Sequence, residues 1–236
     1  MNVHFALRLL TSLLVLAAML VAGCSMSPLK GGNESSSAGA GNSAAKTATG
    51  LSPSNDARKD LRDALMKLNT AYPYRLTETT SGAADGREIP QGTRVVEFAA
   101  ADRSHMKWTG GPGGDVEAIS IGGKHYWYSD GKWTAGALSG KTDRGVDFAK
   151  KLAEMVKEVK YVGPESINGV ACYAYTCTFE MPMSGQNWTG TAKVWIGAAD
   201  GLPHQSDSEY KVANYGGKSH LTYEYNINIK VEPPAL

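Results

Sequence analysis

From Tyr74 to the C-terminus, large apolar and polar residues alternate in short runs that are separated by turn residues. A period of two places successive side chains on opposite faces of a strand, so each run predicts a half-buried β-strand. The clearest run is the last, in which one face carries Leu221, Tyr223, Tyr225, Ile227, Ile229 and Val231. The predicted strands cover residues 74–80, 93–101, 104–109, 116–121, 124–128, 159–166, 170–179, 189–196, 205–212 and 221–231, with a brief extension at 132–134.

Glycine-containing turns connect several of these runs. The turn dipeptides are Gly122-Gly123, Asp130-Gly131, Asn168-Gly169 and Gly216-Gly217. Strands joined by such short connections pair in the antiparallel direction. The sequence therefore predicts one antiparallel sheet built mainly from neighbours in the chain.

Two stretches have a helical period instead. The first follows Ser52-Pro53-Ser54, ends before Pro73 and has one apolar face made by Leu61, Ala64, Leu65 and Leu68. The second covers residues 143–157, and its apolar face is made by Val146, Phe148, Ala149, Leu152, Ala153, Met155 and Val156. Each helix has a single face to bury, so each is expected to lie against the sheet.

About ten antiparallel strands with only two helices predict a mainly β (α+β) protein. We expect a curved antiparallel sheet that forms a half-open β-barrel, with the two helices covering its concave face. A closed lipocalin-like barrel is the competing architecture. A helix of roughly four turns inside the run of strands favours the half-barrel.

The first 24 residues are expected to direct export and not to belong to the fold. Arg8 precedes an apolar run from Leu9 to Val21, which has the length of a signal-peptide hydrophobic region and is short for a membrane-spanning helix. The run ends in Val21-Ala22-Gly23-Cys24, which resembles the lipobox of bacterial lipoproteins, where the cysteine is acylated and the chain is cut before it. The alternative is an ordinary secretory signal with a chance cysteine.

Three parts of the chain follow from this interpretation. Residues 1–23 are the lipoprotein signal peptide, and residues 24–50 are the lipidated Cys24 and a disordered tether rich in Ser, Gly, Ala, Asn and Thr. As a flexible coil, the tether reaches roughly 28 Å. Residues 51–236 are expected to form one folded domain.

Cys172 and Cys177 lie five residues apart in one predicted strand. An odd offset directs their side chains to opposite faces, beyond the reach of a disulfide. Two separate thiols are therefore favoured over a bridge across a turn or bulge.

No residue pattern predicts an enzyme, a metal site or a cofactor. His105, His125, His204 and His220 are isolated, and no nucleophile elbow, Walker loop or dinucleotide fingerprint is present in the sequence. The glycines of residues 110–114 lie between two strands, so a mobile loop is favoured over a phosphate cradle. The net charge of +1 falls to zero when Arg8 leaves with the signal, which argues against a nucleic-acid partner.

Large aromatic residues are abundant along the predicted strands, among them Trp108, Trp127, Trp195, Tyr223 and Tyr225. A thin curved sheet with two helices could not readily bury all of them. An apolar groove is therefore expected.

Five segments resemble, in order, the periplasmic lipoprotein-localisation superfamily: residues 102–108, 119–127, 131–133, 161–169 and 194–203. This superfamily includes a lipoprotein carrier, its outer-membrane receptor and the lipid-binding lipoproteins of mycobacteria. The resemblance covers residues 56–234 and implies a half-open β-barrel whose apolar concavity holds acyl chains under a helical lid. The soluble carrier lacks an acylated cysteine, so Cys24 makes this chain more similar to the anchored members. Ser25 then favours the periplasmic face of the outer membrane or the cell surface.

We therefore expect a membrane-anchored envelope lipoprotein that binds the acyl chains of a lipid or a lipoprotein, for transport or sorting. The candidate lining comprises Val96, Phe98, Met106, Trp108, Ile119, Ile121, Tyr223, Tyr225 and Ile227, with Leu65, Leu68, Leu152 and Met155 as the lid. Alternation alone does not say which strand face points inward, because a shift of one residue inverts every assignment. The alternative is a non-enzymatic envelope scaffold or stress sensor that binds a protein partner and has a fully packed core.

Overall fold

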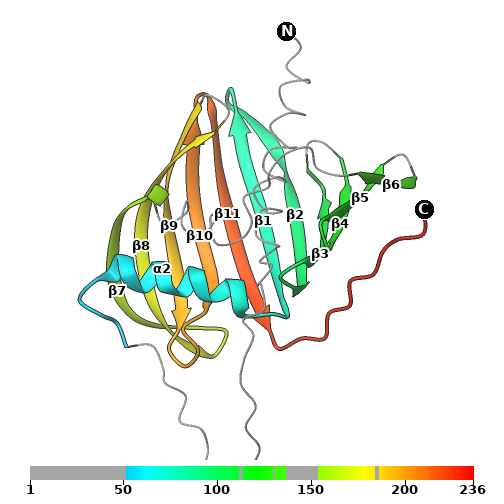
Figure 1. The fold of residues 1–236 in the computed structure, drawn as a ribbon. Coiled ribbons are helices and arrows are strands. Elements are labelled where there is room, and N and C mark those ends of the chain that lie inside the picture. The colour runs from blue at the N-terminus through cyan, green and yellow to red at the C-terminus, as the bar shows by residue number, and fades with distance from the viewer. Residues whose placement is uncertain (1–51, 112–113, 130, 137–153, 184–185) are drawn as a thin grey trace, which may run out of the picture.

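The computed structural model describes residues 52–111, 114–129, 131–136, 154–183 and 186–236 (Figure 1). Helix α2 (Ala57–Lys67) and the short 3₁₀ helix η1 (Leu68–Thr70) precede the sheet. The strands are β1 (Tyr74–Ala84), β2 (Arg87–Ala100), β3 (Arg103–Thr109), β4 (Val116–Ile121), β5 (Lys124–Ser129), β6 (Lys132–Gly136), β7 (Val156–Ile167), β8 (Val170–Met183), β9 (Gln186–Gly197), β10 (Pro203–Val212) and β11 (Tyr215–Tyr225).

The eleven strands form a single antiparallel sheet in the order β6-β5-β4-β3-β2-β1-β11-β10-β9-β8-β7. Nine of the ten pairings join strands that follow one another in sequence, and the tenth joins β1 to β11. Strands β6 and β7 are the two edges, so the sheet is curved but not closed (Figure 1). This confirms the mainly β half-barrel prediction and rejects the closed barrel.

Helix α2 packs on one face of the sheet, which we call the inner face. Its carboxylate cap, Asp56, accepts a hydrogen bond of 3.0 Å from the backbone N–H of Lys59, as expected at a helix start. Leu61 and Ala64 are buried and pack against residues of β7, β8 and β9. The apolar face predicted from the sequence is therefore the face that contacts the sheet. In the described part of the chain, no helix is long and apolar enough to cross a membrane.

The helix predicted over residues 143–157 lies largely outside the described residues. Glu154 and Met155 are helical, but β7 begins at Val156, so the predicted helix end at Lys157 is wrong. Val156 is buried in the same cluster as Tyr175 and Val194, and strand pairing with Phe179 accounts for its extended conformation.

The last predicted strand is wrong at its C-terminal end. Strand β11 ends at Tyr225, and Asn226 has a φ of 58°, which an extended strand does not tolerate. Residues 226–236 leave the sheet as an extended segment without strand pairing, which we call the C-terminal strap (red in Figure 1). Ile229 and Val231 of the strap pack against Ile119 and Tyr126 on the face opposite α2, the outer face.

Gly216 and Gly217 lie within β11 and not in a turn, which corrects another prediction. The chain turns three residues earlier, at Ala213 and Asn214, where Ala213 has a φ of 49°. A Cβ at Gly217 would lie 2.6 Å from Cζ of the Tyr210 ring, so a larger residue here requires that ring to shift. The turns predicted at Gly122-Gly123 and Asn168-Gly169 are confirmed, and these four residues have positive φ angles.

The two cysteines of β8 are free, as predicted, and both are buried. Cys177 belongs to the cluster beneath α2 on the inner face. Cys172 belongs to a separate cluster with Ala174 and Trp195 on the outer face. Burial raises the pKa of both thiols.

Candidate functional site

The inner face is apolar and aromatic at the end of the sheet nearest α2. Tyr74 is almost fully buried, and its ring stacks on Phe98 with centroids 4.6 Å apart. Tyr225 lies 6.1 Å from Tyr74 on the neighbouring strand. The same cluster holds Val96, Met106, Trp108 and Ala118, with Leu68, Ala71, Tyr72, Leu76, Val116 and Trp127 packed against it. This surface extends from β11 to β5.

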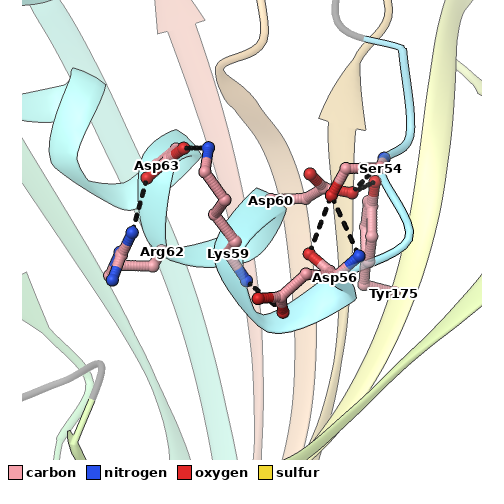
Figure 2. A network of polar contacts seen from close by, with 7 residues as sticks. All are labelled: Ser54, Asp56, Lys59, Asp60, Arg62, Asp63 and Tyr175. Carbon is pink, nitrogen blue, oxygen red and sulfur yellow. Dashed lines mark hydrogen bonds and ion pairs between the residues drawn. The ribbon is translucent and has the colours of Figure 1, made fainter.

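A second apolar cluster lies directly beneath α2. It consists of Leu61, Ala64, Val156, Tyr175, Cys177, Val194 and Ile196. The hydroxyl of Tyr175 donates a hydrogen bond of 3.0 Å to Oδ2 of Asp60, and the backbone N–H of Ser54 donates to the same oxygen at 2.9 Å (Figure 2). Burial and this hydrogen bond raise the pKa of Tyr175 well above its ordinary value. The polar anchor fixes the first turn of α2 on β8.

A cavity of ≈ 870 Å³ lies along the flank of α2, at the start of β7. Its apolar lining comes from Leu61, Leu65 and Met66 of the helix and from Val156 of the strand. Charged side chains line the rest of it: Asp56, Arg58, Lys59, Arg62, Asp63 and Glu154. This volume is in the range of ~300–1,000 Å³ that small-molecule sites occupy.

A buried ion pair interrupts the apolar inner face farther along β1 and β2. Glu78 and Arg94 are directly opposite in the register and form a salt bridge. The hydroxyl of Ser219 donates a hydrogen bond of 2.6 Å to Oε1 of Glu78. Next to the ion pair, a row of small residues crosses six neighbouring strands, each residue directly opposite the next. These residues are Cys177, Ala192, Ser208, Ser219, Thr80 and Gly92.

Aromatic side chains lie across the far end of the inner face. Trp188 stacks on Tyr210 with ring centroids 5.5 Å apart, and Tyr215 lies 5.8 Å from Tyr210. The two phenol oxygens are 3.2 Å apart and share a hydrogen bond. Burial and this contact raise the pKa of Tyr210 well above its ordinary value.

The outer face is polar over β1 and β7 to β11. A depression of ≈ 610 Å³ crosses these strands between rows of charged and hydroxyl side chains, among them Lys160, Thr176, Lys193, Asp207 and His220. It offers no apolar lining comparable to that of the inner face. On this face an acyl chain would displace water from charged groups, which disfavours binding.

The four histidines of the folded domain make local contacts. His105 lies 2.7 Å from Glu117, His204 lies 2.9 Å from Asp200, His125 lies 2.8 Å from Ser120, and His220 pairs with Asp207. Among the residues that the structure describes, no three His, Cys, Asp or Glu side chains are grouped so that they could hold a metal ion.

The structure brings most of the predicted lining residues together. Val96, Phe98, Met106, Trp108, Tyr223 and Tyr225 all lie on the inner face, and Leu65 and Leu68 pack on it from the helix end. Met155 is half-buried beside the start of β7. Leu152 and Cys24 lie outside the described residues.

Ile119, Ile121 and Ile227 are not placed with this group, which corrects their assignment. Ile119 pairs with His105 and Tyr126 on the outer face, where Ile121 packs in the same cluster. Strand β4 is apolar on both faces because the C-terminal strap covers its outer side. Ile227 lies beyond the end of β11.

Sequence reasoning missed Tyr74, Tyr175, Glu78 and Arg94. The sequence pattern could have shown the positions of Glu78 and Arg94. Residues 74, 76 and 78 share one face of β1, and residues 94, 96 and 98 share one face of β2. A single charged residue at the end of each apolar alternation, with opposite signs, was a recognisable signal that each strand carries a charge on its apolar face.

No protein-family model and no curated protein sequence matches the chain. Among solved structures, the lipoprotein LppX of Mycobacterium tuberculosis is similar over 74% of this chain and 97% of that chain, with a TM-score of 0.51 and 18% identity. LprF from Mycobacterium bovis is similar over 78% of this chain and 100% of that chain, with a TM-score of 0.48 and 15% identity. A LolA superfamily protein from Nitrosomonas europaea gives a TM-score of 0.33 at 12% identity, over 74% of this chain and 94% of that chain. At these identities the similarity concerns the fold.

Proposed function

Because the chain has the fold of the LolA/LppX-like superfamily, we propose that its folded domain binds an acyl chain of a lipid or lipoprotein between α2 and the inner face. The protein is then a carrier or sorting component of the bacterial cell envelope. It needs no cofactor and catalyses no reaction in this role.

The observation that carries the proposal is the cavity of ≈ 870 Å³ beside α2, whose apolar wall is made by Leu61, Leu65, Met66 and Val156 and whose remaining wall is made by charged side chains. It adjoins an inner face on which two apolar clusters extend over most of the sheet. Moving about fourteen methylenes from water into such surroundings contributes ~11 kcal/mol of gross transfer free energy. The costs of association and of ordering the ligand reduce that figure.

Helix α2 is suited to act as the cover of this site. Its first turn is fixed to β8 through Asp60 and Tyr175, whereas Leu65, one turn later, is only half-buried. A ligand can therefore be accommodated beside Leu65 while the anchor of the helix stays in place.

Native mass spectrometry of the protein from its own envelope, combined with organic extraction, tests the proposal. We expect co-purified lipid in the wild-type protein and its loss in the variant Leu65→Glu, with the fold intact by circular dichroism. Lys107→Glu is the matched control, because Lys107 is exposed on the outer face of β3. A wild-type domain that carries no lipid and takes up no added fatty acid would contradict the proposal.

We also propose that Cys24 carries the membrane anchor. A diacylglyceryl group with an N-linked acyl chain supplies the two lipid signals that stable attachment needs, at ~0.8 kcal/mol per buried methylene. Ser25 favours sorting to the outer membrane. Cys24→Ala should abolish labelling by a fatty-acid analogue; a labelled Cys24→Ala protein would show that the anchor lies elsewhere.

One observation favours protein binding as a second candidate function. Tyr161 and Val162, large apolar side chains of the edge strand β7, are 41% and 52% exposed. A scaffold or stress sensor could dock an extended segment of a partner there. Uptake of a hydrophobic dye by the wild-type protein separates the two candidates, since a fully packed core takes up none.

A further inference from the structure

The side of helix α2 that faces away from the sheet carries a group of basic side chains, which we call the basic side of α2. Resting on the proposed function, we propose that the basic side docks on an anionic membrane surface, so that the cavity beside the helix opens toward the lipid headgroups. An acyl chain then passes between the bilayer and the cavity without crossing bulk water. The basic side consists of Arg58, Lys59, Arg62 and Lys67, and all four residues are exposed.

The cations of the basic side outnumber the carboxylates beside them. Asp63 pairs with both Lys59 and Arg62, so one carboxylate is shared by two cations (Figure 2). Lys67 donates a hydrogen bond of 3.2 Å to the backbone carbonyl of Asp200, which leaves its charge uncompensated by that contact. Anionic lipids attract such a surface, and the attraction grows with the number of basic residues near the membrane.

The other two acidic residues at the start of the helix are compensated locally. Asp56 accepts the backbone N–H of Lys59 at the helix start, where a negative charge balances the positive end of the helix dipole. Asp60 is buried and accepts a hydrogen bond from Tyr175. The basic side chains are long and reach into solvent, so a surface that approaches α2 from outside meets mainly positive charge.

The basic side borders the cavity. Arg58, Lys59 and Arg62 line the cavity together with the apolar side chains of Leu65 and Met66. Helices that bind membrane interfaces combine basic and apolar residues in this way. In the docked orientation the cations meet lipid phosphates, and the apolar wall of the cavity lies nearest to the acyl chains. Glu154, across the cavity, is the one acidic residue of β7's approach that faces the same space.

The position of the proposed anchor favours the same orientation. Only residues 25–51 separate Cys24 from Ser52, the first residue that the structure describes, and α2 begins shortly afterwards at Ala57. The anchor therefore joins the folded domain at the N-terminal end of α2. A membrane that holds Cys24 stays close to this helix, which raises the effective concentration of headgroups at the basic side.

The outer face is a poorer match for an anionic surface. On β10 and β11, the exposed Lys218 pairs with Glu209, and His220 pairs with Asp207. Each cation of these two pairs has its own carboxylate. A membrane that approached these strands would meet balanced charge, and like charges would offset the attraction.

Lysine acetylation read by mass spectrometry tests the inference on the full chain purified from its envelope. The protein is added to preformed vesicles of phosphatidylcholine, alone or with about one-third phosphatidylglycerol, and bound protein is isolated by flotation. We expect labelling of Lys59 and Lys67 to fall at least about threefold on the anionic vesicles and to recover in about 1 M salt, which screens the charges. Lys218 is the matched control for Lys59, because each is exposed and ion-paired, and its labelling should not change.

A triple variant tests the role of the charges, with Lys59 kept as the reporter. Arg58→Gln, Arg62→Gln and Lys67→Gln together should abolish the protection of Lys59 on anionic vesicles. The same variant should take up a fluorescent fatty acid from these vesicles at least about threefold more slowly than the wild type, because it no longer docks.

The control variant combines Lys107→Gln, Lys124→Gln and Lys132→Gln, which remove the same charge from exposed positions of β3, β5 and β6 and should change neither readout. Equal protection on both kinds of vesicle, equal protection of all lysines, or a protein that floats with neither kind would overturn the inference. So would protection of Lys59 that persists in the triple variant. Protection of Lys59 without any uptake of fatty acid would leave the docking surface standing and overturn the proposed function.

Discussion

The hydroxyl of Tyr175 in β8 donates a hydrogen bond of 3.0 Å to the carboxylate of Asp60 in α2, and both side chains are buried (Figure 2). A carboxylate in an apolar cluster depends on its donors, since an unsatisfied buried charge is costly. This contact therefore holds the first turn of α2 on β8, beside the apolar packing of Leu61 and Ala64.

Tyr175→Phe removes one of the donors to Asp60 without changing the ring. We expect a loss of about 1–3 kcal/mol in the free energy of unfolding, measured by urea denaturation. Asp63→Asn is the control, because Asp63 pairs with Lys59 on the exposed side of the same helix. The control should change stability by less than about 0.5 kcal/mol. Equal effects of the two changes would contradict the anchoring role.

Stability should decrease at alkaline pH. Burial raises the pKa of Tyr74, Tyr175, Tyr210, Tyr223 and Tyr225 above the ordinary phenol value of 10.0. Below pH 10 the phenols are neutral in both states and their contribution is complete. As the pH rises further, the unfolded chain releases these protons first, so folding becomes less favourable. Denaturation at pH 9 and pH 11, with phenolate absorbance of the native protein, checks this; native tyrosines that all titrate near pH 10 would refute it.

Gly217→Ala should destabilise the inner face. The added Cβ would lie 2.6 Å from Cζ of Tyr210, so the aromatic ring must shift and its stacking on Trp188 is disturbed. We expect a loss of about 1–3 kcal/mol by equilibrium unfolding. Gly136→Ala is the matched control, because nothing lies within 4 Å of its added Cβ.

The C-terminal strap should contribute to stability. Val231 is 5% exposed and packs with Ile119 and Tyr126, while Trp133 lies in the same cluster. Val231→Ala should lower the free energy of unfolding by about 1–3 kcal/mol, followed by tryptophan fluorescence. Asn228→Ala, at an exposed position of the strap, should have little effect. If both variants match the wild type, the strap does not stabilise the outer face.

The two thiols of β8 should resist modification in the folded protein. Cys172 and Cys177 are buried on opposite faces, and burial raises their pKa, so little thiolate is present at neutral pH. Ellman's reagent should react with both only after unfolding, with and without prior reduction. Rapid reaction of either thiol in the native state would show that β8 opens locally.

The sequence predicted the sheet well because strand alternation and turn residues act over short distances. Asn168-Gly169 and Gly122-Gly123 have the positive φ angles that hairpin turns need. The opposite-face placement of Cys172 and Cys177 followed from spacing alone.

The errors arose where an interaction distant in sequence determined the outcome. Ile227, Ile229 and Val231 continue the alternation of β11, but the strand ends at Asn226, which is left-handed, and Ile229 and Val231 pack on the outer face. Their destination also explains why Ile119 is apolar on the outer face of β4. A local sequence pattern predicts neither the course of the strap nor the apolar outer side of β4, because these two segments bury each other.

The ion pair of the inner face also depends on an interaction that a local sequence pattern does not show. Alternation places Glu78 and Arg94 on one face, but it does not say that they are paired across β1 and β2. The register that pairs them depends on the whole β1–β2 hairpin, which is longer than predicted and turns at Asp85 and Gly86.

The order of strands also has a kinetic consequence. Every pairing except β1 with β11 joins adjacent strands, so both halves of the sheet can assemble from local hairpins. The pairing of β1 with β11 joins the two halves and must close a long loop. Glu78 and Ser219, which meet across this pairing, are 141 residues apart in the sequence. Loop closure of this kind is slow, because the entropy is lost before the contacts form. Refolding should therefore show early hairpin signals and a later phase in which β1 pairs with β11, and a nascent chain would complete the sheet only after β11 has been released.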